Sequence, residues 1–170
     1  MSTVDADLDS LADPFRARAE RLVAMLAREG LPFRVFETRR KFSRSRELYM
    51  RGRAYKDGVL TKVGPTVSNA RAGESPHNWG CAVDCVLIPK EHAFWEGEEP
   101  ATGPWDDGRA NPLVKLAWER YGRCARACDL SWGGDFVSFS DLPHVELRTW
   151  KTLRPSDWKA IALREVQAGR

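Results

Sequence analysis

The sequence has 170 residues, of which 42% are hydrophobic and 30% are charged, so we expect a single domain with one core. No run approaches the roughly 18 apolar residues that a helix needs to span a bilayer, which argues against insertion into a membrane. The net charge is +3 and the basic residues are scattered among acidic ones, so no nucleic-acid-binding stripe is predicted.

The N-terminal segment, residues 1–12, is polar and acidic, and we expect it to be flexible. A secretory signal would begin with a basic segment and an apolar run, so we expect the protein to be made in the cytoplasm; a signal already removed from this sequence is the alternative. Asp13 and Pro14 predict the start of a helix. Its apolar residues recur at helical spacing until Gly30 ends it: Phe15, Ala19, Leu22, Val23 and Leu26.

The next predicted elements carry several basic residues. Residues 31–38 alternate as a strand that leads directly to Arg39 and Arg40. A short helix is predicted over 43–53. A turn at Asp57-Gly58 precedes a strand at 59–63, and a polar loop at 68–74 is expected to border a cleft.

The first chemical motif lies at residues 75–84, Ser-Pro-His-Asn-Trp-Gly-Cys-Ala-Val-Asp. Gly80 allows the backbone to turn after His77, and residues 81–87 are then predicted to form a buried strand. A carboxylate within an apolar strand is unfavourable unless it is paired, hydrogen-bonded or bound to a metal. Asp84 is therefore better explained as a metal ligand than as one half of a salt bridge.

The middle of the chain is predicted to contain a long loop and a helix. Residues 88–112 lack periodicity, and within them Trp95 or Trp105 is a candidate to border a substrate groove, whereas His92 is expected at the surface. A helix over 112–129 follows, with Leu116 among its apolar positions. The chain then passes through Trp132-Gly-Gly-Asp, where the glycines allow close backbone approach.

The second chemical motif is Asp141-Leu-Pro-His144, within residues 141–147 that alternate as an edge strand would. Two of the three histidines of the chain lie in the two motifs, each with a carboxylate nearby. Zinc accepts histidine nitrogen and aspartate oxygen, and catalytic zinc sites usually keep three protein ligands. Two histidines, one aspartate ligand and a further carboxylate to move a proton are sufficient for metal-assisted hydrolysis. A last amphipathic helix follows Pro155, and we expect it to pack on the domain, with a part in substrate recognition as the alternative.

The four cysteines form two pairs with Cys-x-x-x-Cys spacing, at Cys81 and Cys85 and at Cys124 and Cys128. This is not the usual spacing of a four-cysteine zinc site. We expect buried thiols where the helix packs behind the strand, with a disulfide between them as the alternative if the protein works outside the cell.

The two motifs together, Ser-x-His-x-x-Gly-x-Ala-x-Asp and Asp-x-Pro-His, resemble the M15 family of zinc peptidases, and the resemblance extends loosely over residues 33–147. The family includes D-alanyl-D-alanine carboxypeptidases and dipeptidases, and the L-alanyl-D-glutamate endopeptidases of phage endolysins and bacterial cell-wall hydrolases. The resemblance implies that His77, Asp84 and His144 are zinc ligands and that Asp141 is the general base. An aspartate at that last position, where the carboxypeptidases and dipeptidases usually have glutamate, is similar to the endopeptidase branch.

The resemblance also implies further site residues. An arginine after the first strand would stabilise the oxyanion, and Arg40 matches this position better than Arg39; a solvated basic patch is the alternative. Ser75 and Trp132 are candidates to bind substrate or to support the ligands. A local turn hydroxyl and a core tryptophan are the respective alternatives.

We therefore predict an α+β protein with a flexible N-terminus at 1–12 and a single M15-like peptidase domain at 13–170. It would have a central antiparallel sheet, helices packed against it and a zinc site at one face of the sheet. The predicted function is zinc-dependent cleavage of the L-alanyl-D-glutamate bond of peptidoglycan by a monomer, as a phage endolysin that reaches the cell wall after release from the cytoplasm. The alternatives are a D-alanyl-D-alanine carboxypeptidase and a non-catalytic zinc-binding cell-wall module.

Overall fold

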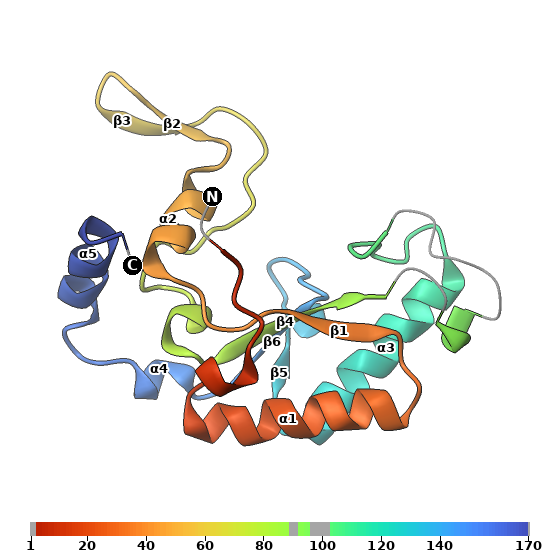
Figure 1. Ribbon diagram of the computed structural model, residues 1–170. Coiled ribbons are helices and arrows are strands. Elements are labelled where there is room, and N and C mark those ends of the chain that lie inside the picture. The colour runs from red at the N-terminus through yellow and green to blue at the C-terminus, as the bar shows by residue number, and fades with distance from the viewer. Residues whose placement is uncertain (1–2, 89–91, 96–102, 170) are drawn as a thin grey trace.

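The protein is described here from a computed structural model, which describes residues 3–88, 92–95 and 103–169 (Figure 1). Its centre is a four-stranded antiparallel sheet in the order β1-β4-β6-β5. The strands are β1 (Phe33–Glu37), β4 (Ala82–Leu87), β6 (His144–Glu146) and β5 (Ser131–Trp132). The α+β class and the antiparallel sheet agree with the sequence prediction.

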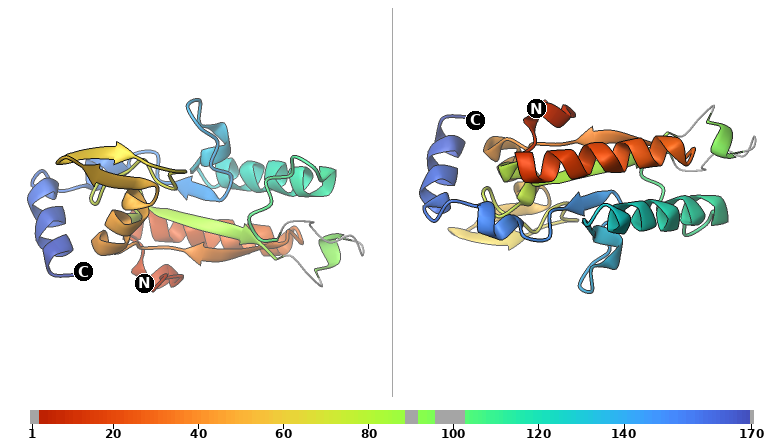
Figure 2. Two further views of the ribbon diagram at one scale, coloured as in Figure 1. Left: turned by 90° about the horizontal axis from the view of Figure 1, so that it is seen from above. Right: turned by 90° about the horizontal axis from the view of Figure 1, so that it is seen from below.

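Two long helices, α1 (Asp13–Arg28) and α3 (Pro112–Ala127), lie side by side and cover one face of this sheet (Figures 1 and 2). Alternation along β4 decides which side chains meet them. Cys81, Val83, Cys85 and Leu87 belong to the hydrophobic core, whereas Asp84 is only partly buried and points away from it. The apolar face of β4 thus fixes the side on which a polar site can form.

The other helices and a hairpin lie at one end of the sheet, where β1 leads into the next helix (Figure 1). Helix α5 (Trp158–Gln167) packs on α2 (Phe42–Met50), and α4 (Trp150–Leu153) precedes it. Strands β2 (Arg53–Lys56) and β3 (Val59–Lys62) form a separate two-stranded sheet. The sequence predicts β3 but not β2, because the predicted helix extends through residues 51–53. Packing of the last helix on the domain is confirmed.

Two predictions about element positions are wrong. Strand β6 is not at an edge, because it pairs with both β4 and β5. Its second neighbour, β5, has only two residues, which is too short to show alternation in a sequence. Leu116 does not face the core but is 42% exposed, whereas Trp118 of the same helix is buried.

The N-terminal segment makes contacts that the prediction of a flexible N-terminus did not anticipate. Residues Leu8–Ser10 form a short 3-10 helix, and Leu11 is buried. The amide of Thr38 donates to Asp5 O at 2.7 Å, and the amide of Ala12 donates to Gly80 O at 2.9 Å. Backbone partners of this kind cannot be read from residue types. These hydrogen bonds connect the N-terminal segment to Thr38, which precedes His77 in the sequence, and to Gly80, which follows it.

All four cysteines are free and buried, as expected. Burial raises the pKa of Cys81 to about 11 and that of Cys85 to about 12. Both thiols are therefore neutral and behave as small hydrophobic side chains.

No helix within the described ranges combines the length and the hydrophobicity that a membrane crossing requires.

Candidate metal centre

Three donor atoms from distant parts of the sequence meet on the polar face of the sheet. His77 Nε2 lies 3.1 Å from Asp84 Oδ1, His144 Nδ1 lies 3.0 Å from the same oxygen, and the two nitrogens are 3.3 Å apart. Ligands at about 2.0–2.1 Å from a tetrahedral zinc are separated by roughly 3.3–3.4 Å. Two imidazoles and a carboxylate at these distances could therefore hold a metal ion, and the predicted trio is brought together.

Local structure explains how these residues converge. His77 lies in a 3-10 turn, Pro76–Trp79, that ends at Gly80 in the left-handed conformation with φ of 65°. A Cβ at Gly80 would approach the amide nitrogen of Ala12 to 2.8 Å, so glycine is needed for both the backbone conformation and the close approach. The chain then enters β4, where antiparallel pairing sets Asp84 directly opposite His144.

Each imidazole is oriented by a partner on its other nitrogen. His77 Nδ1–H donates to Thr38 O at 2.6 Å, and His144 Nε2–H donates to Glu146 Oε2 at 3.2 Å. Metal-binding histidines usually donate their second N–H to a carbonyl or carboxylate in this way. The tautomers so fixed leave His77 Nε2 and His144 Nδ1 with lone pairs for a metal.

The electrostatics of the trio show strong coupling. Burial opposes ionisation of Asp84, yet His77 and His144 hold the pKa of this carboxyl well below its ordinary value. Burial disfavours charge on His144 too, but the hydrogen bonds to Asp84 and Glu146 outweigh it and raise the pKa of His144 to about 10. A compact group of donors around a strongly stabilised carboxylate is well suited to a cation.

Substituting Glu146 tests whether its contact with His144 supports metal binding. We expect Glu146→Gln to weaken metal affinity by about 10–100-fold, because the amide accepts the imidazole N–H less strongly than a carboxylate does. Affinity would be measured by competition with a chromophoric chelator. Glu119→Gln, which alters an exposed carboxylate near Lys115 on α3, is the matched control. Equal affinity of both variants and the wild type would show that Glu146 does not act through His144.

Asp141 is held close to the trio by backbone contacts. Its amide donates to Gly133 O at 3.0 Å, its own carbonyl accepts from the amide of His144 at 3.1 Å, and Trp132 Nε1–H donates to Leu142 O at 2.8 Å. Burial raises the pKa of Asp141, with His144 acting against it and Asp84 reinforcing it. Asp141 is thus a carboxyl group that gives up its proton less readily than an exposed aspartate.

An ion-pair network that the sequence reading missed lies on the other side of Asp84. Glu37, which is 2% exposed, accepts from Arg40 Nε at 2.9 Å and from Arg44 Nε at 2.5 Å. Arg40 Nη2 also lies 3.3 Å from Asp84 Oδ2, whereas Arg39 is exposed. Arg40 is therefore the arginine at the site. The sequence contained a signal for this network, because Glu37, like Asp84, is a carboxylate in a largely apolar strand.

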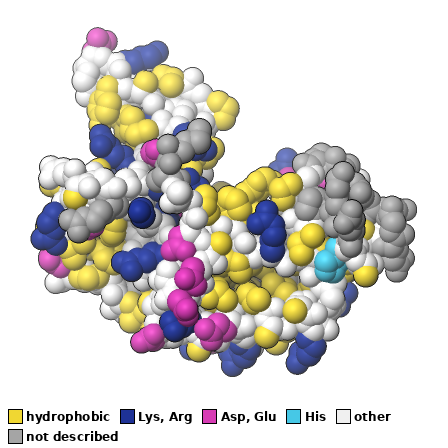
Figure 3. Space-filling model, viewed as in Figure 1, with side chains coloured by type: hydrophobic (Ala, Val, Ile, Leu, Met, Phe, Trp, Pro, Cys, Tyr) yellow, Lys and Arg dark blue, Asp and Glu magenta, His cyan; other side chains and the backbone are white. Residues whose placement is uncertain are grey.

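The centre opens into a cleft of about 1050 Å³ that contains His77, Asp84 and His144 in its lining. Helix α2 and the loop after β3 form one wall, and a loop at residues 136–141 forms another. In the space-filling view the part that carries the hairpin projects from the body of the molecule, and the surface beside it is recessed (Figure 3). Trp105 lies where this cleft meets a second pocket of about 790 Å³.

The other predicted site residues and the two tryptophans proposed to border the groove lie in different surroundings. Ser75 is 5% exposed and lines the cleft. Trp132 is 8% exposed and belongs to the core, so it supports the loop at Asp141 and contributes only to the lining of the second pocket. Trp95 is buried and does not border the cleft, whereas Trp105 is 53% exposed and does.

Two comparisons of sequence agree with the motifs. The sequence model of an M15 peptidase family, described as D-alanyl-D-alanine carboxypeptidase, matches residues 68–147. The chain is 35% identical over 133 residues to the peptidoglycan L-alanyl-D-glutamate endopeptidase CwlK of Bacillus subtilis (strain 168), covering 78% of this chain and 70% of CwlK. The crystal structure of the L-Ala D-Glu endopeptidase ChiX of Serratia marcescens aligns over 87% of each chain, with 25% identity and a TM-score of 0.48.

The matched region contains all three donor residues and Asp141. Identity to CwlK extends well beyond this region, over more than three quarters of the chain. On this basis the chain belongs to the M15 peptidase family.

Proposed function

We propose that this protein is a zinc-dependent peptidoglycan endopeptidase that hydrolyses the L-alanyl-D-glutamate bond of the peptide stem. The observation that carries the proposal is the set of three donor atoms, 3.0–3.3 Å apart, in the lining of a cleft that also contains Asp141. Two nitrogens and one oxygen with a tetrahedral spacing suit zinc. The activity in the name of CwlK supports the choice of bond.

The residues would divide the reaction as follows. When bound by His77, Asp84 and His144, zinc supplies Lewis acidity that polarises the scissile carbonyl and makes a water molecule a better nucleophile. Asp141 accepts the proton of the attacking water and delivers it to the leaving amine, a task for which a raised pKa is suitable. Arg40 places a fixed positive charge beside the site, where negative charge develops on the substrate oxygen.

A second candidate activity is D-alanyl-D-alanine carboxypeptidase, which is the description of the family model that matches residues 68–147. The two activities cleave different bonds of the same peptide stem. The presence of aspartate rather than glutamate at position 141 favours the endopeptidase.

The test is mass spectrometry of the products that the protein releases from purified peptidoglycan. Zinc-loaded protein and protein treated with a chelator would be compared, followed by zinc added back. New D-glutamate amino termini that appear only with zinc support the endopeptidase. Release of D-alanine alone would instead indicate the carboxypeptidase, and absence of cleavage despite bound zinc would indicate a non-catalytic cell-wall module.

We further propose that the protein acts as an endolysin, made in the cytoplasm and active on the wall after release. Its net charge of +3 would favour approach to an anionic wall. Fractionation of producing cells, before and after the membrane is permeabilised, tests this: lysis that begins only on permeabilisation supports it, and wall-associated protein in intact cells would contradict it.

A further inference from the structure

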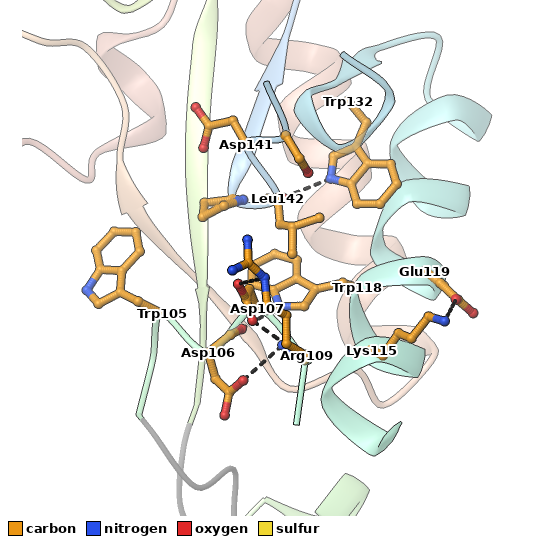
Figure 4. A pocket seen from close by; sticks show the side chains of 13 residues that line it. Trp105, Asp106, Asp107, Arg109, Lys115, Trp118, Glu119, Trp132, Asp141 and Leu142 are labelled. Carbon is orange, nitrogen blue, oxygen red and sulfur yellow. Dashed lines mark hydrogen bonds and ion pairs between the residues drawn. The ribbon is translucent and has the colours of Figure 1, made fainter. Parts of the chain in front are cut away.

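A second pocket lies next to the cleft, and Figure 4 shows the side chains that line it. It shares Trp105, Ser140 and Asp141 with the cleft, so the two spaces lie next to each other at the proposed general base. The rest of its lining includes Trp118, Leu142 and the segment 106–109. A ligand chain that passes Asp141 can therefore occupy both spaces at once.

The wall of this pocket is held in place by defined contacts. Trp118 Nε1–H donates to Asp106 O at 2.8 Å, and the amide of Gly108 donates to Asp106 Oδ1 at 2.9 Å. Gly108 has φ of 75°, and a Cβ there would come within 2.5 Å of the backbone nitrogen of Lys115. The segment is thus fixed against the start of α3.

Trp105 presents a large aromatic surface to the opening. Its side chain is 53% exposed, and its ring meets Phe36 edge to face, with centroids 4.7 Å apart and an interplanar angle of 81°. A half-exposed indole that packs against a neighbouring ring provides apolar contact at little entropic cost. Such a surface suits the C–H face of a sugar ring, whose hydroxyls can reach polar groups at the rim.

The charges of the two spaces differ in a way that orients a substrate. In the second pocket each cation is matched by a carboxylate: Arg109 Nε lies 2.9 Å from Asp107 Oδ2, and Lys115 Nζ lies 3.9 Å from Glu119 Oε1. On the α2 side of the cleft, Arg51 is exposed and forms no ion pair with the described part of the chain. A free carboxylate is therefore better accommodated near Arg51 than in the second pocket.

In peptidoglycan, the two sides of the L-alanyl-D-glutamate bond differ in charge in the same way. The L-alanine is joined through a lactyl group to a neutral amino sugar, and the D-glutamate, linked through its side chain, has a free carboxyl group next to the bond. We propose that the pocket between Trp105 and the segment 106–109 is a subsite for the sugar that carries L-alanine, with the carboxylate-bearing peptide directed toward Arg51. This proposal rests on the proposed endopeptidase function.

The test compares two substrates that differ only in the sugar: a muramyl tripeptide, and the same tripeptide capped by D-lactate alone. We expect the wild type to cleave the muramyl substrate with a kcat/KM about tenfold higher. Trp105→Ala should reduce this preference to about twofold or less, and Trp105→Phe should retain part of it. Arg51→Gln should lower kcat/KM for both substrates by a similar factor, because both carry the carboxylate.

Tyr55→Ala is the matched control, since Tyr55 is 68% exposed and lines neither space, and its preference should equal that of the wild type. A wild-type preference near one, or an equal loss on both substrates in Trp105→Ala, would overturn the sugar subsite while leaving the endopeptidase intact. If neither substrate is cleaved, the endopeptidase proposal fails. The subsite is then decided by calorimetric binding of N-acetylmuramyl-L-alanine, which should be detectable for the wild type and at least about tenfold weaker for Trp105→Ala.

Discussion

Replacing Asp141 by asparagine is expected to lower kcat/KM on peptidoglycan peptides by about 10²–10⁴-fold, the usual contribution of general acid–base catalysis. The amide has the shape of the carboxylate but cannot accept a proton from water at neutral pH. Backbone groups hold position 141, through Gly133 and the amide of His144, so the loop should keep its conformation. The measurement is single-substrate kinetics on a defined muropeptide.

Two controls separate loss of the base from loss of the metal. Zinc content of Asp141→Asn, measured by mass spectrometry of the metal, should stay near that of the wild type, because Asp141 is not part of the donor trio. Asp135→Asn removes an exposed carboxylate that pairs with Arg126 at 2.8 Å and should leave kcat/KM close to the wild-type value. If Asp141→Asn retained most of the activity, Asp141 would not be the base.

Replacing Glu37 by glutamine is expected to lower the free energy of unfolding by about 3 kcal/mol, because it leaves two nearly buried guanidinium groups without their shared counter-charge. Glu37 is 2% exposed, and the side chains of Arg40 and Arg44 are 11% and 12% exposed. Water can therefore do little to replace the lost carboxylate. Equilibrium unfolding in urea measures the change.

A surface pair provides the comparison for Glu37. Glu29 accepts from Arg120 at 3.3 Å with both side chains at least 30% exposed, and exposed pairs contribute only about 0–1 kcal/mol. Glu29→Gln should therefore change stability little. A Glu37→Gln protein as stable as Glu29→Gln would mean that Arg40 and Arg44 find other partners, and Arg40 would then not be held in position by Glu37.

The donor trio was predictable because its chemistry restricts the residue types. The motifs that contain His77, Asp84 and His144 also contain glycine, proline and an apolar strand. The glycine and proline indicate a fixed turn, and a carboxylate within the apolar strand indicates a buried charge that needs a partner. Alternation along 81–87 also gave the correct face of Asp84. The same reasoning, applied to the strand before Arg40, would have identified Glu37.

Other features depended on contacts that a sequence does not display. Strand β5 is too short to show a period, so the central position of β6 could not be foreseen. Leu116 and Trp118 lie two positions apart on α3, and only the direction in which the helix packs decides which of them is buried. Trp132 was equally compatible with a pocket wall and a core residue until its neighbours were known.

The sequence by itself predicted the ligand residues and the α+β class from residue type and local spacing, and the family resemblance of its two motifs added the candidate base. Only the tertiary structure decided that Arg40 rather than Arg39 reaches Asp84, that Glu37 holds it, and that Trp105 stands where the cleft joins a second pocket. The physical reason is that these relations are set by strand pairing and by the packing of loops. Such pairing joins residues far apart in the chain, as Asp84 and His144 are.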